Sequence, residues 1–380
     1  MPPADVEISA RIDAVDTVAD VPRTDGWTYL GEDIVEAYVD ALAALPNPST
    51  PRDLTMVYTP LHGVGDETVE KVLQRAGFSK PVAVPEQVEP DAAFPTVAFP
   101  NPEEPGAMDL AMALAAEVSA DLVVANDPDA DRCAVAVPTT NGWRMLRGDE
   151  LGALLGHHLL SLGTTGVFAT TIVSSSLLGH MAQDHGVSYE ETLTGFKWIG
   201  RVTGLSYGYE EALGYCVAPQ LVRDKDGISA LLLIAEIAAT LKAEGSSLLE
   251  RLDEIAHHYG LYATDQLSVR VTDLRLIEAA MQQLRSAPPT SLGGLTVESG
   301  DDLSLGSDML PPTEGLRYRL ASGGRVVVRP SGTEPKIKCY LEVVVPVEAG
   351  GVDAARIAAT GRLDAIRTDL AAAAGLPASA

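Results

Sequence analysis

The sequence is poor in cysteine and in basic residues, and both shortages restrict what the protein can be. Its three cysteines, Cys133, Cys216 and Cys339, are far apart, so neither a disulfide framework nor a paired metal-ligand spacing is available. We expect them to be small buried hydrophobic residues in a reducing compartment. Lys and Arg number 27 against 53 Asp and Glu, a net charge of −26, so a basic nucleic-acid-binding surface is not expected.

Long apolar runs are also missing. The longest, residues 228–235, ends before Glu236 and is too short to cross a bilayer. The first residues carry acids early and lack the apolar segment of a signal peptide. With 46% hydrophobic and 21% charged residues in 380 positions, the composition is that of a soluble globular protein of two or three domains. We therefore expect a cytoplasmic protein that binds neither nucleic acid nor membrane.

The first two thirds of the chain alternate short apolar strands with helices, which predicts a parallel or mostly parallel sheet covered by helices. The segments expected there are strands at 54–58, 122–125 and 167–173 and helices at 67–76, 151–162, 175–185 and 228–242. Beyond about residue 264 the pattern is α+β. The segments expected there are strands at 265–271, 317–320, 325–328 and 337–345 and helices at 275–286 and 352–374.

Three aspartates at alternate positions directly follow a predicted apolar strand. Asp127, Asp129 and Asp131 can turn the same way in an extended loop, where they repel one another unless a cation lies between them. Carboxylate oxygens suit Mg²⁺, so the spacing predicts a magnesium site, with a solvated acidic turn as the alternative. An EF-hand is excluded because Arg132 and Pro138 stand where that loop needs Gly and Glu.

A second loop reverses the local charge. Between Arg325 and Lys338 four basic residues stand against one acid, Glu334, in a chain that is strongly acidic overall. Arginine can fork onto an oxyanion, hydroxyl groups can donate to it, and glycine lets backbone N–H groups approach it closely. The candidate phosphate ligands are Arg329, Ser331, Gly332, Thr333 and Lys336. A hairpin turn with charged flanks is the alternative.

Three further features are weaker on their own. Glu210 and Glu211 are flanked by glycines and tyrosines, which suits hydrogen bonds to sugar hydroxyls, although paired glutamates are also common at helix starts. Lys197 is an isolated cation beside aromatic residues. His62 precedes a glycine turn after a strand, where open α/β folds place ligands, so it is a candidate to line a site.

These loops, in this order, resemble those of the α-D-phosphohexomutase family, which includes phosphoglucomutases and phosphomannomutases. The resemblance covers nearly the whole chain. Its segments are residues 58–65, 94–105, 127–132, 192–199, 209–215, 223–227 and 329–336. The family's fold implies two related α/β domains with mixed sheets plus a C-terminal α+β domain. The domains would span residues 27–150, 151–262 and 263–380, with residues 1–26 as the tail of a preceding domain.

The resemblance also implies an activity. In this family a phosphoserine gives its phosphoryl group to a sugar phosphate, and the bisphosphate returns its other phosphoryl group to the serine. By position, the three aspartates of 127–131 would hold Mg²⁺, Arg132 would help at the reacting phosphate, and Lys197 would contact substrate or assist proton transfer. His62, as a residue that lines the site, is placed with Arg132 and Lys197 among the catalytic candidates. The glutamates at 210 and 211 would bind sugar hydroxyls, and the loop 329–336 would hold the phosphate that is not reacting. Hexose phosphates and hexose bisphosphate would be the ligands of a monomer or weak dimer.

Two departures from the family pattern matter. Ala212 stands where many relatives have Ser after the loop glutamate, and the nucleophile segment Thr-Ala-Ser-His-Asn-Pro does not occur in these 380 residues. We expect the chain to begin near the end of the first domain and to be a truncated or inactive form. Ser174, Ser175 and Ser176 are rejected as substitutes, because a serine run there more commonly caps a helix.

Two other functions stay open. An aspartyl-phosphate phosphatase would use Asp127 and Asp129 after the strand, but it needs Thr or Ser near position 131, which is Asp131 here. A non-catalytic sugar-phosphate-binding protein would keep the cleft without the nucleophile.

Overall fold

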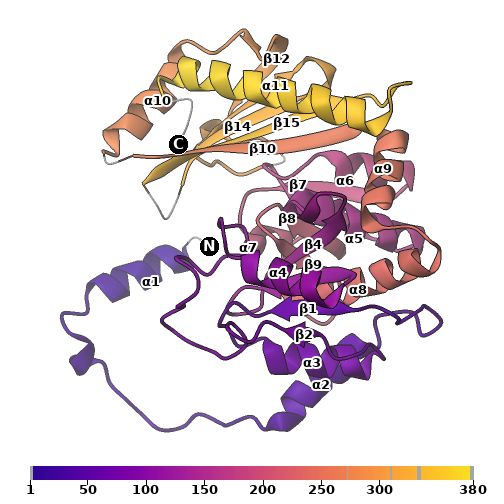
Figure 1. The fold of residues 1–380 in the computed structure, drawn as a ribbon. Helices are drawn as coiled ribbons and strands as arrows, with labels where there is room; N and C mark the ends of the chain where they lie inside the picture. Colours follow the sequence, from indigo (N-terminus) through magenta and orange to yellow (C-terminus); the bar gives the residue numbers. More distant parts are fainter. Residues whose placement is uncertain (1–2, 272, 309, 332–334, 377–380) are drawn as a thin grey trace. The chain divides into compact units, whose positions relative to one another are not determined.

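The computed structural model describes residues 3–271, 273–308, 310–331 and 335–376 (Figure 1). The chain divides into two units, Met1–Tyr38 and Val39–Ala380, each taken here by itself. The N-terminal unit holds helix α1 (Ala4–Asp13), the 3₁₀ turn η1 (Val18–Asp20) and the start of helix α2 (Glu32–Ala43). Neither α1 nor η1 buries a side chain.

The first sheet of the larger unit is mixed and has the order β2-β1-β3-β4-β5. Its strands are β1 (Met56–Thr59), β2 (Val82–Ala83), β3 (Leu122–Asn126), β4 (Cys133–Thr139) and β5 (Gly142–Met145). The first three are parallel, and β4 and β5 are antiparallel to their neighbours. Strands β1 and β3 are buried throughout, as central strands covered on both faces are. The helices of this region are α3 (Asp66–Arg75) and α4 (Asp109–Val118).

The second sheet is also mixed, with the order β7-β6-β8-β9. Its strands are β6 (Val167–Thr171), β7 (Ser188–Thr192), β8 (Leu205–Glu210) and β9 (Gly214–Cys216). Strands β6, β7 and β8 are parallel, and β9 is antiparallel to β8. The helices of this region are α5 (Gly148–Ser161), α6 (Leu177–Asp184), α7 (Phe196–Ile199), α8 (Gly227–Ala243) and α9 (Leu248–Tyr259). Helix α8 is buried over most of its length because it packs on β3 and β4 of the first sheet and on β9 of the second.

The third sheet is antiparallel and has the order β10-β15-β14-β13-β12-β11. Its strands are β10 (Leu261–Arg270), β11 (Ser291–Leu292), β12 (Leu295–Asp302), β13 (Leu316–Leu320), β14 (Arg325–Pro330) and β15 (Lys336–Val345), joined in part by the 3₁₀ turns η2 (Leu303–Leu305) and η3 (Ala321–Gly323). Helices α10 (Arg275–Ser286) and α11 (Gly351–Ala374) lie together beside it, and α11 runs along β10 and β15 (Figure 1).

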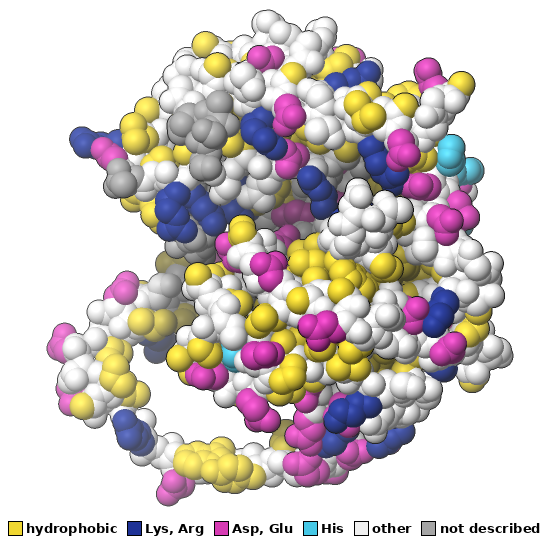
Figure 2. Space-filling view, in the orientation of Figure 1, with side chains coloured by type: hydrophobic (Ala, Val, Ile, Leu, Met, Phe, Trp, Pro, Cys, Tyr) yellow, Lys and Arg dark blue, Asp and Glu magenta, His cyan; other side chains and the backbone are white. Residues whose placement is uncertain are grey.

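This architecture confirms the predicted fold class, two α/β regions with mixed sheets followed by an α+β region. The three cysteines are buried and free, as expected. Within the described ranges, no helix is both long enough and apolar enough to cross a bilayer. Acidic side chains (magenta in Figure 2) are spread over the face shown, with Lys and Arg in smaller groups between them, in keeping with the net charge of −26.

Candidate functional site

The three aspartates form a cluster at the carboxyl end of β3. Asp127 directly follows the strand and is buried, Asp131 is half-buried and Asp129 is exposed. Each offers a carboxylate oxygen that lies within 4.8 Å of those of the other two. Because the donors are all carboxylate oxygens, the set fits a hard cation such as Mg²⁺ better than a metal that prefers nitrogen or sulfur.

Two glycines pack closely against the backbone of this aspartate loop. A Cβ at Gly63 would overlap the backbone of Pro128, and a Cβ at Gly227 would overlap the backbone carbonyl of Arg132. The backbone N–H of Val64 also donates to the Pro128 carbonyl over 2.9 Å. The loop is therefore fixed by the turn after β1 and by the first residue of α8.

Two cations partly neutralise the aspartate loop. Arg132 Nε contacts Asp127 Oδ2 at 2.5 Å, and its backbone N–H donates to Oδ1 over 3.0 Å. Burial raises the pKa of Asp127, while Arg132 acts in the opposite direction. Lys225 Nζ lies 2.6 Å from Asp131 Oδ2. Burial alone would lower the pKa of Lys225, but the bond to Asp131 and the charges of Asp131 and Glu210 together outweigh it, and the pKa is raised. Much of the acidic charge is therefore balanced from within the chain.

The two glutamates lie at the carboxyl end of β8 rather than at a helix start. The Glu210 carboxylate accepts the backbone N–H of Gly195. Glu211 Oε2 accepts hydrogen bonds from Ser174 Oγ at 2.9 Å and Thr171 Oγ1 at 3.3 Å. Burial, and then the charge of Glu210, raise the pKa of Glu211. Carboxylates at this strand end can accept hydrogen bonds from hydroxyl groups of a ligand.

The aspartate loop, which carries Asp127, Asp129 and Asp131, contacts the loop that carries Glu210 and Glu211, called here the glutamate loop. Arg132 forms an isolated antiparallel bridge with Gly214, the first residue of β9. Lys225 bonds to Asp131 and also attracts Glu210, so one cation serves both loops. The two loops therefore form one continuous polar surface.

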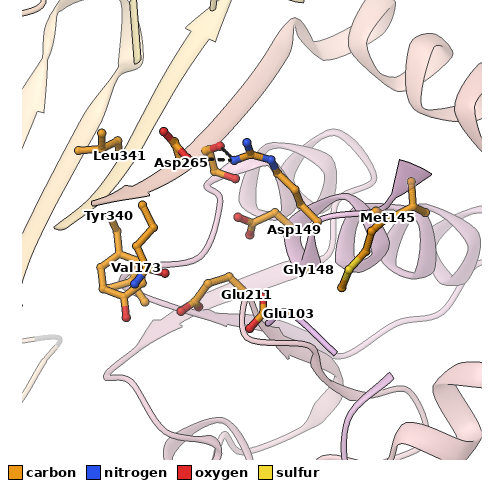
Figure 3. Close-up of a pocket in the computed structure, with 13 residues that line it drawn as sticks. Glu103, Met145, Gly148, Asp149, Val173, Glu211, Asp265, Tyr340 and Leu341 are labelled. Carbon is orange, nitrogen blue, oxygen red and sulfur yellow. Dashed lines mark hydrogen bonds and ion pairs between the residues drawn. The ribbon is translucent and has the colours of Figure 1, made fainter. Parts of the chain in front are cut away.

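A cavity of about 320 Å³ opens beside Glu211 (Figure 3). Its walls come from the regions of all three sheets. The lining residues are Glu103, Met145, Leu146, Arg147, Gly148, Asp149, Val173, Glu211, Thr264, Asp265, Gln266, Tyr340 and Leu341. Asp149 accepts the backbone N–H of Ser175 at 2.7 Å, and burial raises the pKa of Asp149 to about 7. Clustered carboxyl groups suit a ligand's hydroxyl groups better than its anionic end.

The start of the basic loop, residues 329–336, lies close to this cavity. Tyr340 forms part of the cavity wall, and its hydroxyl contacts the Arg329 side chain. The Ser331 N–H donates to the Lys336 carbonyl over 2.8 Å and closes the hairpin. Gly332 and Thr333 lie outside the described residues.

Arg325, counted in the sequence among the basic residues of this loop, has a different place. It is buried, its Nη1 contacts Glu191 at 2.9 Å, and it also bonds to the Ser174 carbonyl. It therefore ties the third sheet to the second and is not available to a phosphate.

His62 and Lys197 are placed differently from the carboxylates. His62 is buried, and its Nε2 contacts Thr96 Oγ1 at 2.8 Å. It lies next to Gly63 and so one residue from the contact with the aspartate loop. Lys197 is exposed on α7, and among the residues that the structure describes no carboxylate lies within ion-pair distance of it.

Sequence reasoning missed several residues of the site. Lys225 and Glu103 stand in segments that carry the family resemblance, but nothing in their spacing singled them out. The serines expected to cap a helix instead mostly bond to carboxylates: Ser174 to Glu211, and Ser176 to Glu342 at 2.5 Å. Of these three side chains, that of Ser175 alone bonds to the start of α6, where its Oγ accepts the Leu177 N–H.

Comparison with known proteins finds one family throughout. Models of the phosphoglucomutase/phosphomannomutase family match alpha/beta/alpha domain II at residues 36–142, alpha/beta/alpha domain III at 147–259 and the C-terminal domain at 267–359. A Haemophilus influenzae protein described as "Probable phosphomannomutase" is 45% identical over 345 residues, which are 90% of this chain and 70% of that protein.

Other relatives are more distant. The phosphopentomutase of Mus musculus is 38% identical over 327 residues, 76% of this chain and 52% of that protein, so this chain spans about half its length. The crystal structure of a phosphoglucomutase/phosphomannomutase family protein from Burkholderia thailandensis superposes with a TM-score of 0.68 at 18% identity, covering 96% of this chain and 69% of that one. The fold is shared.

Proposed function

Because the chain belongs to the phosphoglucomutase/phosphomannomutase family, we propose that its three loops bind Mg²⁺ and a sugar phosphate for phosphosugar mutase chemistry. The observation that carries this proposal is the cluster of Asp127, Asp129 and Asp131, packed against two glycines at the end of β3. Mg²⁺ there would neutralise charge on a phosphoryl group.

Each loop has a separate task in this proposal. Arg132, fixed against Asp127, presents the rest of its guanidinium to the reacting phosphate. Glu210 and Glu211 accept hydrogen bonds from the sugar hydroxyls. Arg329, steadied by Tyr340, holds the phosphate at the other end of the sugar through a charge-assisted contact.

A mutase of this family also needs a residue that carries the phosphoryl group. The family's Thr-Ala-Ser-His-Asn-Pro segment does not occur in residues 1–380, and Ser174 already bonds to Glu211. Covalent transfer needs a nucleophile that can hold a phosphoryl group between two steps. We therefore propose that these residues bind the substrate, while turnover needs a serine from outside residues 1–380.

The test is calorimetric titration of the chain with glucose 1-phosphate, mannose 1-phosphate and free glucose, with and without Mg²⁺. We expect the sugar phosphates to bind better than glucose. We expect Arg329→Ala to weaken sugar-phosphate binding about tenfold to a hundredfold, because it removes a charge-assisted contact, and to leave glucose binding nearly unchanged.

Arg319→Ala is the matched control, since Arg319 is exposed on the neighbouring strand β13. Equal weakening of glucose and its phosphates by Arg329→Ala would show that Arg329 only supports the fold. Absence of sugar-phosphate binding by the unaltered chain would contradict the proposed function.

A further inference from the structure

Glu103 enters the cavity beside Glu211 from a loop that none of the site motifs includes. Its backbone is held by a turn in which the Asn101 side chain accepts the Glu103 N–H at 3.2 Å and the Asn101 carbonyl accepts the Glu104 N–H at 3.0 Å. Figure 3 shows the side chains of Glu103 and Glu211 next to each other on one side of the cavity, with Asp149 nearby. The first sheet's region therefore supplies a carboxyl group to the cavity that contains the second sheet's glutamate.

The charged groups around Glu103 come from every loop of the candidate site. Desolvation by the surrounding cavity walls, then the charges of Glu211 and Asp149, raise the pKa of Glu103, while Arg132 and Lys338 lower it, and the result is about 7. Arg132 belongs to the aspartate loop and Lys338 to β15, opposite Arg329 on β14. Glu103 therefore lies within electrostatic reach of both the proposed metal end and the proposed phosphate end of a ligand.

We propose that Glu103 is a substrate-contact residue that shares with Glu211 the binding of the sugar hydroxyl groups. This inference rests on the proposed function. The side chain keeps access to solvent, so a ligand in the cavity can reach it. Both oxygens of its carboxyl group can accept hydrogen bonds from the hydroxyl groups of a sugar, and the protonated form can also donate one.

The neighbouring Glu104 provides a matched control. Like Glu103 it is exposed, and it carries the same side chain one residue away, but it does not line the cavity. Glu103→Gln and Glu104→Gln therefore remove the same charge from the same loop, and only the first changes a cavity wall. An effect of overall charge or of loop stability would appear in both variants.

The experiment measures, in saturating Mg²⁺, the affinities of the chain for glucose 1-phosphate and for inorganic phosphate. Their ratio isolates the contribution of the sugar, because the electrostatic effect of removing an acid acts on both ligands. We expect Glu103→Gln to lower this selectivity about tenfold, since a charge-assisted hydrogen bond becomes a neutral one, and Glu104→Gln to leave it unchanged.

A second measurement is made on the unaltered protein, and it uses Glu103→Gln only to assign one resonance. In protein labelled with carbon-13 at glutamate carboxyls, one resonance absent from Glu103→Gln should titrate near pH 7 and move when glucose 1-phosphate is added. Selectivity unchanged in Glu103→Gln, equal loss in Glu104→Gln, or a Glu103 resonance that ignores the sugar phosphate would overturn the inference. Failure of the unaltered chain to prefer glucose 1-phosphate over phosphate would instead refute the proposed function itself.

Discussion

The first and second sheets follow one plan but present different residues at the same place. In each, the third strand lies parallel to the first and is followed by an antiparallel strand: β3 and β4 in one, β8 and β9 in the other. The carboxyl end of β3 leads into Asp127, Asp129 and Asp131, and the end of β8 carries Glu210 and Glu211. Both loops are therefore placed by the same strand arrangement.

The difference between the loops lies in the spacing of their acids. Aspartates at alternate positions bring three carboxylates into one cluster. Adjacent glutamates point to different partners, Glu210 to the Gly195 N–H and Glu211 to Ser174. The shared topology thus decides where each loop lies, while residue spacing decides whether it gathers oxygens around a cation or spreads them along a ligand.

The largest expected effect tests whether the aspartate loop binds Mg²⁺ and the glutamate loop binds the sugar phosphate. Asp129→Ala should weaken Mg²⁺ binding about a hundredfold, because a hard oxygen ligand is lost, and should not lower the stability of the metal-free protein, because repulsion is relieved. Glu211→Gln should leave Mg²⁺ affinity unchanged and weaken the binding of glucose 1-phosphate. Titration calorimetry of both variants with both ligands measures this. Similar Mg²⁺ affinity in the two variants would remove the distinction between the loops.

The second prediction concerns the glycine that packs against each loop, Gly63 for the aspartate loop and Gly148 for the glutamate loop. A Cβ at Gly63 would overlap the backbone of Pro128 in the aspartate loop, and a Cβ at Gly148 would overlap the Glu211 carbonyl. Each Ala substitution should lower the free energy of unfolding by about 1–3 kcal/mol, because backbone must move. Gly63→Ala should mainly weaken Mg²⁺ binding, and Gly148→Ala should mainly weaken binding of the sugar phosphate.

Gly361→Ala is the control for this pair, since Gly361 is exposed in α11 with nothing within 4 Å of its added Cβ. It should hold or raise the free energy of unfolding by up to about 1 kcal/mol, because Ala favours helix. Denaturant unfolding measures all three variants. Parallel losses of both ligands in Gly63→Ala and Gly148→Ala would mean that the loops do not act separately.

Local patterns made much of the fold readable from sequence. The helix expected at 275–286 has those bounds in the structure because its apolar positions recur at helical spacing. The strand expected from residue 265 begins at Leu261, since Gly260 ends α9 with a positive φ and the strand's first residues are only half-buried. Half-buried strand ends carry a weak alternation signal.

The limits at the site have the same cause. The aspartate cluster could be predicted because its three members are close in sequence. The partner of Arg325 is Glu191, more than a hundred residues earlier, so a basic residue assigned to the phosphate loop is instead an internal tie. Glu103 meets Glu211 across a similar separation. Pairings that only the tertiary fold creates leave no local pattern.

The third prediction concerns the cation that links the loops. Lys225→Met keeps an unbranched chain over Gly214 but removes the ammonium group from Asp131. Mg²⁺ affinity should rise about fivefold, because a competing cation is gone, and the metal-free protein should lose about 1 kcal/mol of stability. Lys80→Met is the control. It breaks the ion pair of Lys80 with Glu70, in which the lysine is far more exposed than Lys225 is, and it should leave Mg²⁺ affinity unchanged. A fall in Mg²⁺ affinity in Lys225→Met would show that Lys225 orders the aspartate loop instead of competing for it.

The smallest expected effect concerns Asp149, a half-buried acid that bonds to Tyr209 on the strand before Glu211. Asp149, bonded to the Tyr209 hydroxyl at 3.1 Å, has its pKa raised to about 7, first by burial. Because the folded pKa exceeds the unfolded value, the folded state binds the proton more tightly, and this stabilisation is present below about pH 4 and is lost as the pH rises towards 7. Asp149→Asn cannot ionise, so its melting temperature relative to the unaltered protein should rise between pH 5 and about pH 8. Thermal unfolding in metal-free buffers across this range measures it, and a difference that stays constant with pH would mean that the Asp149 carboxyl does not ionise as its burial predicts.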